Sequence, residues 1–383
     1  MVKATYPVSP AVVDWVISQL GTHTTPVDSL PLLKEWQAGV KTPTLSEIET
    51  VSKKTHIPLG YFFLQTPPKE EIKLMEFRTI ASTSSENPSR DLIDTIEDME
   101  QIVDWTRDYL IADGSEVNPI VGKLKHETNV GVIANYIRQV LGLSINWFEK
   151  KEPPFNYLRD RMSEGGIIVM MNGVVRNNTH RPLNIDEFRA FAIADTFAPL
   201  IFINATDSKS GRLFSLLHEF VHICLGVDDL FNDRHSTVKG VSKLEILCNA
   251  VAAEILVPTN LFYSTWESFI SRSSSTEETI HKVSHFFKCG NIVVARKALD
   301  TGKISHVTYD NIVQNALKHY IENRKSKDSG GNFYNTKGSR IDKRFLTFVV
   351  DSVSRGTTLY SEAFRLTDTN RHTFPKLVER MND

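Results

Sequence analysis

The strongest chemical pattern in the chain is the five-residue motif His218-Glu219-Phe220-Val221-His222. If this segment is helical, His218 and His222 lie one turn apart on the same face, which allows two imidazoles to share one metal ion. A zinc ion with three protein ligands leaves its fourth position to water and lowers the pKa of that water towards neutrality. Glu219 is placed to take a proton from the water and deliver it to a leaving amine. The motif therefore predicts hydrolytic zinc chemistry; the alternative is a pair of ordinary core or surface histidines.

A third ligand must come from elsewhere, and two acidic residues compete for this role. Asp228 follows His222 closely, but a sharp turn into a third ligand requires a glycine where the chain has Leu225. Glu245 lies on the next expected helix, and an antiparallel return of that helix could aim it at the two histidines. The spacing favours Glu245 and leaves Asp228 open.

The elements around the motif predict an α+β fold. A helix from about Gly211 to Leu225 carries the motif, and a second helix, SKLEILCNAVAAEIL, carries Glu245 and stops at Val257-Pro258. Upstream, the runs IIVMM, FRAFAIA and LIFINA are rich in β-branched and aromatic residues and predict three strands. We therefore expect a zincin-like metallopeptidase core, with a short three-stranded sheet against which the motif helix packs. Mostly helical N- and C-terminal regions should flank this core.

Turn-forming segments and composition divide the chain into four expected domains. These are a helix-turn-helix-like helical domain at 1–66, a helical connecting region at 67–150, the metallopeptidase core at 151–264 and a helical C-terminal region at 265–383. Within the first domain the helices are expected at Pro10–Leu20, Ser29–Gln37, Leu45–Thr55 and Leu59–Leu64.

Composition limits the possible partners and the cellular location. A hydrophobic fraction of 41%, a charged fraction of 23% and a formal net charge of −2 give no global attraction to nucleic acid or membrane. The three cysteines have no C-x-x-C spacing, so we expect reduced thiols. The N-terminus lacks an apolar signal core, and no run of about eighteen apolar residues occurs. We expect a cytoplasmic protein with no membrane partner.

Several other residues have types that could do chemistry, but each has a simpler structural explanation. His281 and His285 share the four-residue spacing, but no glutamate follows His281, so a solvated or helix-packing role is favoured. Cys224 points away from the motif face and is expected in the core. His235, in the loop after the motif helix, could stabilise an oxyanion, and Arg212 could orient a substrate carbonyl; ordinary structural roles are favoured for both.

Two segments together resemble the ImmA/IrrE family of metallopeptidases. They are LFSLLHEFVHICLG and the helix bearing Glu245, Cys248 and Asn249, which is similar to the family pattern E-x-x-A-N-x-F-A-A-x-L-L-M-P. The resemblance covers about residues 155–260. It implies that Glu245 is the third zinc ligand, that Glu219 is the catalytic acid and base, and that the substrates are transcriptional repressors or other regulatory proteins. The departures, which include Cys248 for alanine and Val257 for methionine, leave the ligand set untouched.

The segment LLKEWQAGVKTPTLSEIETVSKKTHIPLGYFF resembles the second half of Cro/repressor-type helix-turn-helix domains. However, residues 1–66 contain five lysines against five acidic residues, whereas DNA binding through phosphates requires a basic face. Two interpretations stay open for this region: DNA binding, or a helical bundle for protein contacts or dimerisation.

Taken together, the sequence predicts a zinc-dependent endopeptidase that cleaves a regulatory protein in stress response, mobile-element control or toxin–antitoxin regulation. The predicted site consists of the metal ligands His218, His222 and Glu245 with the catalytic Glu219, and Zn2+ is the expected cofactor. The expected partner is a protein substrate or regulator, such as a repressor or toxin. The alternative is a non-proteolytic regulatory protein, an antitoxin or DNA-associated repressor, in which the metal core has a structural or sensing role.

Overall fold

The computed structural model of the chain describes residues 4–20, 30–68, 88–227, 229–231, 243–324 and 340–380. Contacts between its elements divide the chain into two compact units, Met1–Asp98 and Met99–Asp383. Each unit contains its own cluster of buried apolar side chains. The four domains expected from the sequence use different boundaries, and these boundaries stay predictions.

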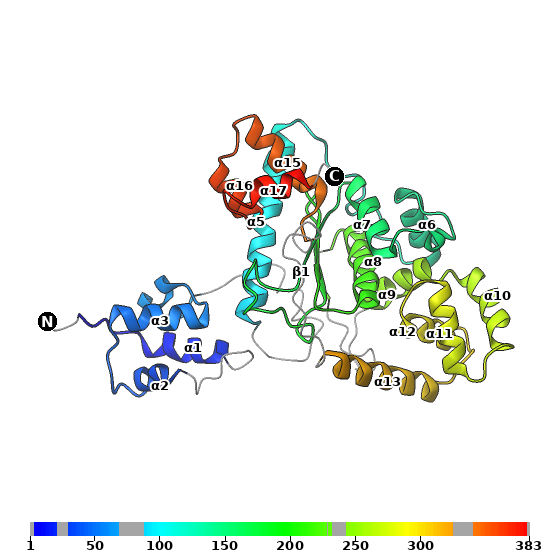
Figure 1. The fold of residues 1–383 in the computed structure, drawn as a ribbon, viewed down its shortest axis with the longest axis horizontal. Coiled ribbons are helices and arrows are strands. Elements are labelled where there is room, and N and C mark those ends of the chain that lie inside the picture. Colours follow the sequence, from blue (N-terminus) through cyan, green and yellow to red (C-terminus); the bar gives the residue numbers. More distant parts are fainter. Residues whose placement is uncertain are drawn as a thin grey trace. The chain divides into compact units, whose positions relative to one another are not determined.

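Four helical segments of the N-terminal unit are drawn in blue in Figure 1. They are α1 (Pro10–Leu20), α2 (Pro31–Gln37), α3 (Leu45–Thr55) and the 3₁₀ helix η2 (Leu59–Phe63). The predicted spans of α1 and α3 are confirmed, whereas α2 begins at Pro31 and η2 ends at Phe63. A reciprocal capping box starts α3, in which the Thr44 side chain accepts from the Glu47 N–H and the Glu47 side chain accepts from the Thr44 N–H.

Three α-helices lie between the N-terminal region and the sheet, and the first two agree with the helical connecting region expected from the sequence. They are α5 (Arg90–Ala112), α6 (Val130–Val140) and α7 (Pro154–Glu164), with a short 3₁₀ helix η3 (Trp147–Glu149) between the last two. The Asn129 side chain caps α6. Gly165 and Gly166 end α7, with Gly166 at φ +88°.

The sheet has four strands in the order β1-β3-β2-β4. The three predicted strands form as β1 (Ile168–Asn172), β2 (Ala190–Ile193) and β3 (Leu200–Asn204), with β1 parallel to β3 and β2 antiparallel to it. The fourth strand, β4 (Asp229–Phe231), pairs antiparallel with β2. It corrects the expectation of a three-stranded sheet followed by a loop, because three residues are too short to show a period-two pattern.

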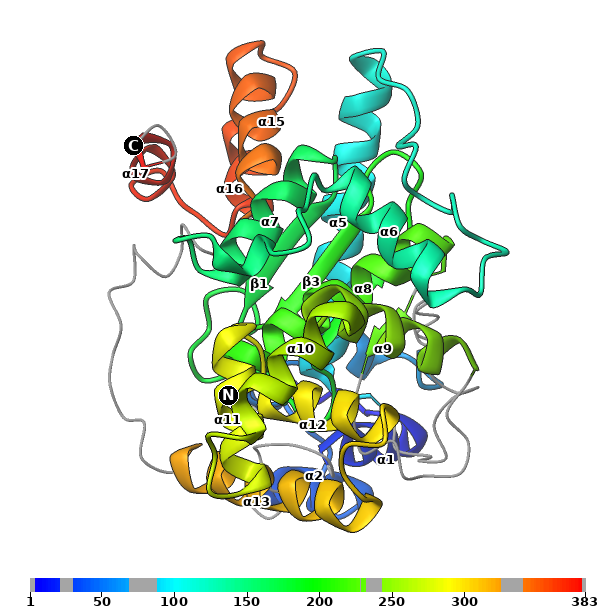
Figure 2. The same ribbon diagram turned by 90° about the vertical axis from the view of Figure 1, so that its right-hand side faces the viewer.

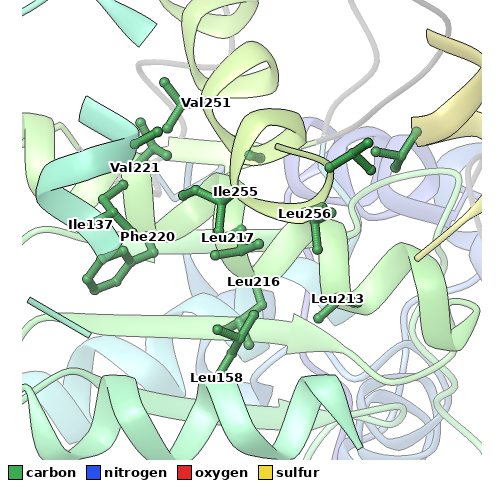
Figure 3. Packing of buried hydrophobic residues seen from close by; sticks show 14 of the residues in the cluster. Ile137, Leu158, Leu213, Leu216, Leu217, Phe220, Val221, Val251, Ile255 and Leu256 are labelled. Atoms are coloured by element: carbon green, nitrogen blue, oxygen red, sulfur yellow. The ribbon is translucent and has the colours of Figure 1, made fainter. Parts of the chain in front are cut away.

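Two helices pack on the sheet, and a third helix packs on one of them to build the main core. α7 lies beside β1, and α8 (Lys209–Leu225) lies beside β3 (Figure 2). α9 (Lys243–Leu256) packs on α8. Figure 3 shows Leu217 and Val221 of α8 close to Ile255 and Val251 of α9, and all four side chains are fully buried. The predicted packing of the motif helix on the sheet is confirmed.

The rest of the chain is helical, as predicted. In order, it contains α10 (Thr259–Ile270), α11 (Thr276–Phe286), α12 (Asn291–Asp300), α13 (His306–Arg324), α15 (Lys343–Ser354), α16 (Tyr360–Leu366) and α17 (Phe374–Glu379). α10 to α13 pack in succession, each on the next (yellow to orange in Figure 1). Among the described residues, no single helix is long and apolar enough to cross a membrane, although α9 and α10, bent by 60°, reach that length and composition as a pair.

Candidate metal centre

Local sequence fixes both ends of α8, the helix that carries the motif. The Ser208 side chain accepts a hydrogen bond from the Gly211 N–H and begins the helix, while Gly226, at φ +71°, ends it. From Leu213 onwards almost every position is buried, including His218, Glu219 and His222. A helix that is buried all round sits in the centre of the core, so these polar side chains are held inside it.

His218 and His222 face each other across one helical turn. Their Nε2 atoms lie 3.1 Å apart, and both side chains have no exposed surface. Two ring nitrogens at this distance converge on one point, as the four-residue spacing predicts. The Phe214 ring, one turn earlier, lies 6.2 Å from the His218 ring and extends the same row of side chains.

Glu245, in the first turn of α9, completes this group. Its Oε2 atom lies 3.2 Å from His218 Nε2, and its Oε1 atom lies 3.2 Å from His222 Nε2. Burial acts to raise the pKa of the Glu245 carboxyl, but hydrogen bonds with His218 and His222 outweigh burial and lower the pKa well below its ordinary value. Glu245 keeps 18% side-chain exposure, so the centre reaches the surface beside this carboxylate.

The three donor groups fit a zinc ion. One ligand atom from each of His218, His222 and Glu245 can be chosen so that all lie within 4.8 Å of one another, and no other such group occurs among the described residues. Tetrahedral zinc with bonds of about 2.0–2.1 Å to nitrogen and oxygen requires ligand atoms about 3.3 Å apart, close to the contacts of 3.1 and 3.2 Å. Two neutral imidazoles and one carboxylate are also the donors of a catalytic zinc site that leaves one position open.

Glu219 lies between the two histidines in the chain and has no exposed surface. Its backbone position on α8 is fixed by the same helix that presents His218 and His222. A glutamate on this helix is a candidate to exchange protons with a molecule held at the donors. The catalytic role of Glu219 stays a prediction from the sequence.

The other candidates from the sequence lie away from the donor cluster or outside the described residues. Cys224 is fully buried in the core, and burial raises its pKa. Arg212 packs over the Phe155 ring at 5.9 Å and lies 3.5 Å from the Met171 sulfur. Asp228 and His235 lie outside the described residues.

His281 and His285 are exposed on α11 and are not part of the donor cluster. The structure thus places them where the sequence favoured a solvated or helix-packing role. They line a pocket together with Ser210 of α8, which the sequence did not indicate.

Two further polar side chains near the donors were given no role from the sequence. Ser215 Oγ and Asn249 Oδ1 are buried and have no hydrogen-bond partner among the residues that the structure describes. Ser215 lies one turn before Glu219 on α8, and Asn249 lies one turn after Glu245 on α9, so each shares a helix face with a site residue. Buried polar atoms of this kind need a partner, which makes both candidates for ordering water or a peptide group. In the sequence, both residues could have been found by their four-residue spacing from Glu219 and Glu245.

The fold and the donor set are compatible with a metallopeptidase-type domain. A family model described as an IrrE N-terminal-like domain (Peptidase_M78) matches residues 171–299, which include all three donors and Glu219. This match supports the resemblance to the ImmA/IrrE metallopeptidases. A second model, a domain of unknown function (DUF8813), matches residues 341–380, where α15, α16 and α17 lie. No curated protein matches the chain.

Proposed function

We propose that this protein is a zinc-dependent endopeptidase that cleaves a regulatory protein. The observation that carries the proposal is the convergence of His218, His222 and Glu245 from two helices, at 3.1–3.2 Å between their ligand atoms, with Glu219 beside them. The peptidase-family match over the same residues supports it independently.

Each residue of the site has a defined task in this proposal. His218, His222 and Glu245 hold the zinc ion, which when bound polarises the scissile carbonyl and lowers the pKa of the attacking water. Glu219 removes a proton from that water as a general base and delivers it to the departing amine as a general acid. Burial of Glu219 strengthens its electrostatic interactions by excluding bulk water.

The proposed substrate is a repressor or another regulator, in a stress-response, mobile-element or toxin–antitoxin setting. The resemblance of residues 155–260 to the ImmA/IrrE family supports this substrate class. DNA binding by the N-terminal unit is kept as a separate hypothesis, tested with the full chain and a library of random duplexes at 50 and 200 mM salt. Binding that vanishes at the higher salt and selects no sequence would exclude a repressor-like role.

The decisive experiment compares the wild-type protein with the Glu219→Gln variant. Both are expected to contain about one zinc ion per chain, because Glu219 is not a ligand. Each protein is then incubated with a lysate, and new peptide N-termini are identified by mass spectrometry. We expect wild type to generate new termini that are at least about a hundredfold rarer with Glu219→Gln. Zinc without any difference in cleavage would favour the non-proteolytic alternative, and absence of zinc from both would defeat the metal-centre proposal.

A further inference from the structure

A pocket of about 430 Å³, with several polar side chains in its wall, lies outside the donor cluster. Its wall is formed by Ser210 near the start of α8, by His281 and His285 of α11, and by Lys288 and Asn291 at the turn into α12. These groups offer N–H and O–H donors, and Lys288 carries a positive charge. Among the described residues, no aspartate or glutamate lines the pocket. The lining therefore favours an anionic ligand.

The three helices that form the pocket wall are in direct contact with one another. A Cβ atom at Gly290 would lie 3.1 Å from the Ser210 Cβ, so the start of α12 packs directly on the start of α8. Ser284 Oγ lies 2.5 Å from Asn291 Oδ1 and ties α11 to α12. Lys288 donates one hydrogen bond to the Lys150 carbonyl over 2.8 Å, and its ammonium group has two further protons to donate.

Ser210 in the pocket wall and His218 in the donor cluster lie on the same face of α8. Ser210, Phe214 and His218 follow one another at intervals of four residues and so form one row along the helix. With a rise of 1.5 Å per residue, Ser210 lies about 12 Å along the axis from His218. An extended peptide advances about 3.3 Å per residue, so roughly four residues cover this distance.

We propose that the pocket is a specificity subsite of the peptidase, which binds the carboxylate of an Asp or Glu side chain about four residues from the scissile bond. The inference rests on the proposed peptidase function and adds a substrate class to it: segments with an acidic residue at a fixed distance from the cut. Ser210, His281, His285 and Lys288 supply the donors, and the row of side chains on α8 sets the distance.

Binding is measured with the full chain carrying Glu219→Gln, so that the probe stays intact. The probes are two fluorescein-labelled octapeptides that differ only in four central residues, all Glu in one and all Gln in the other. We expect the Glu peptide to bind about tenfold more tightly by fluorescence anisotropy, a difference of about 1.4 kcal/mol. The combined substitution His281→Gln, His285→Gln and Lys288→Gln should abolish this preference. Equal binding of both peptides to the unsubstituted pocket would overturn the inference.

The single variant Lys288→Gln is compared with a matched control, Lys282→Gln. The control also removes one positive charge, but from a part of α11 outside the pocket lining. Lys282 pairs with Glu278 at 2.9 Å. Lys288→Gln should weaken binding of the Glu peptide about threefold or more, and Lys282→Gln should leave it unchanged. If both variants lose affinity equally, general charge attraction explains the binding and the subsite is refuted.

A second readout uses the sites that wild type cuts in the lysate. Acidic residues should be enriched about four positions from these cuts, and Lys288→Gln should reduce the enrichment while cleavage itself continues. Cleavage without such enrichment would count against the subsite alone. Failure to find zinc or cleavage would overturn the peptidase function, while the anisotropy experiment would still decide whether the pocket binds acidic peptides.

Discussion

Gly226 and Gly122 pack backbone against backbone: a Cβ atom at Gly226 would lie 2.8 Å from the Cα atom of Gly122. The Gly122 N–H donates to the Ile223 carbonyl over 3.0 Å, and the Leu124 N–H donates to the Cys224 carbonyl over 2.9 Å. The Leu124 bond satisfies a carbonyl in the last turn of α8, while the Ile223 carbonyl also accepts from the Gly226 N–H at the helix end. The contact therefore fixes the end of the helix that presents both histidines.

Substitution of Gly226 by alanine should destabilise the protein by about 2–4 kcal/mol. Its φ of +71° costs about 1 kcal/mol for a residue with a Cβ, and the clash with Gly122 adds about 1–3 kcal/mol. The free energy of unfolding is measured by urea denaturation. Gly302→Ala is the matched control, because its φ is +70° and nothing lies within 4 Å of its Cβ position. Equal losses in the two variants would mean that the contact with Gly122 contributes nothing.

The third metal ligand can be identified by comparing Glu245→Ala with Asp228→Ala. Glu245 is bonded to both histidines, so its removal should lower zinc affinity by at least about a hundredfold, more than the loss of an outer partner typically costs. Asp228→Ala should leave the affinity unchanged. Zinc affinity is measured by competition with a chromophoric chelator. A loss confined to Asp228→Ala would reverse the assignment.

Local patterns made the helices and half of the site predictable. The Thr44 capping box, the glycines after Glu164 and the alternation from periodic helix to apolar strand all act over a few residues. The pair His218 and His222 is predictable for the same reason, since one helical turn fixes their relation. Glu245 was only a candidate from spacing, because its approach depends on how α9 returns along α8.

Features that depend on distant segments were not predictable. β4 is recognised by its pairing with β2 and has no pattern of its own. Within the helical region expected from residue 265 onwards, α11 ends at Phe286, and Lys288 adopts a φ of +52° before α12 begins. The pocket beside Ser210 exists because α8, α11 and α12 meet there, although Ser210 and His281 are far apart in sequence.

Glu254 forms a polar cluster at the end of α9. Its Oε2 atom accepts hydrogen bonds from Lys297 Nζ at 2.5 Å and Thr259 Oγ1 at 2.6 Å. Burial acts to raise the pKa of this carboxyl, but the bonds from Lys297 and Thr259 outweigh burial and lower the pKa below its ordinary value. A lowered pKa in the folded state adds stability above the pKa of the unfolded chain, about 4.3, and this stability is lost as the pH falls through the folded value.

Glu254→Gln should therefore lower the free energy of unfolding by about 1–3 kcal/mol at pH 7. The difference from wild type should shrink as the pH falls from about 5 through 4, because wild type loses the same interaction when Glu254 takes up a proton. Urea denaturation at several pH values measures both effects. As a control, Glu267 pairs with Lys303 but is 62% exposed, so Glu267→Gln should cost less than about 1 kcal/mol. A pH-independent difference for Glu254→Gln would contradict the assigned cause.

The segment before α15 covers the edge of the sheet at β1. The Met171 N–H donates to the Arg340 carbonyl over 2.9 Å, and the Val169 N–H donates to Asp342 Oδ2 over 3.3 Å. These two donors of an edge strand would otherwise lack a partner in the sheet, because β1 pairs with β3 on its other side. Asp342 belongs to the region matched by DUF8813, so the start of this region is bonded to the sheet.

Asp342 joins the segment before α15 to strand β1. Its substitution should therefore lower the free energy of unfolding by more than the loss of an ordinary helix cap does. It is 1% exposed, and its carboxylate accepts bonds from the Phe345 N–H at 3.0 Å, the Ser163 hydroxyl at 3.2 Å and the Val169 N–H at 3.3 Å. Asp342→Ala should lower the free energy of unfolding by about 2–4 kcal/mol, since it removes the cap and leaves buried donors unsatisfied. Ser275→Ala removes the exposed cap of α11 and should cost about 1 kcal/mol. If urea denaturation gives equal losses, the carboxylate acts only as a cap and does not hold the segment to β1.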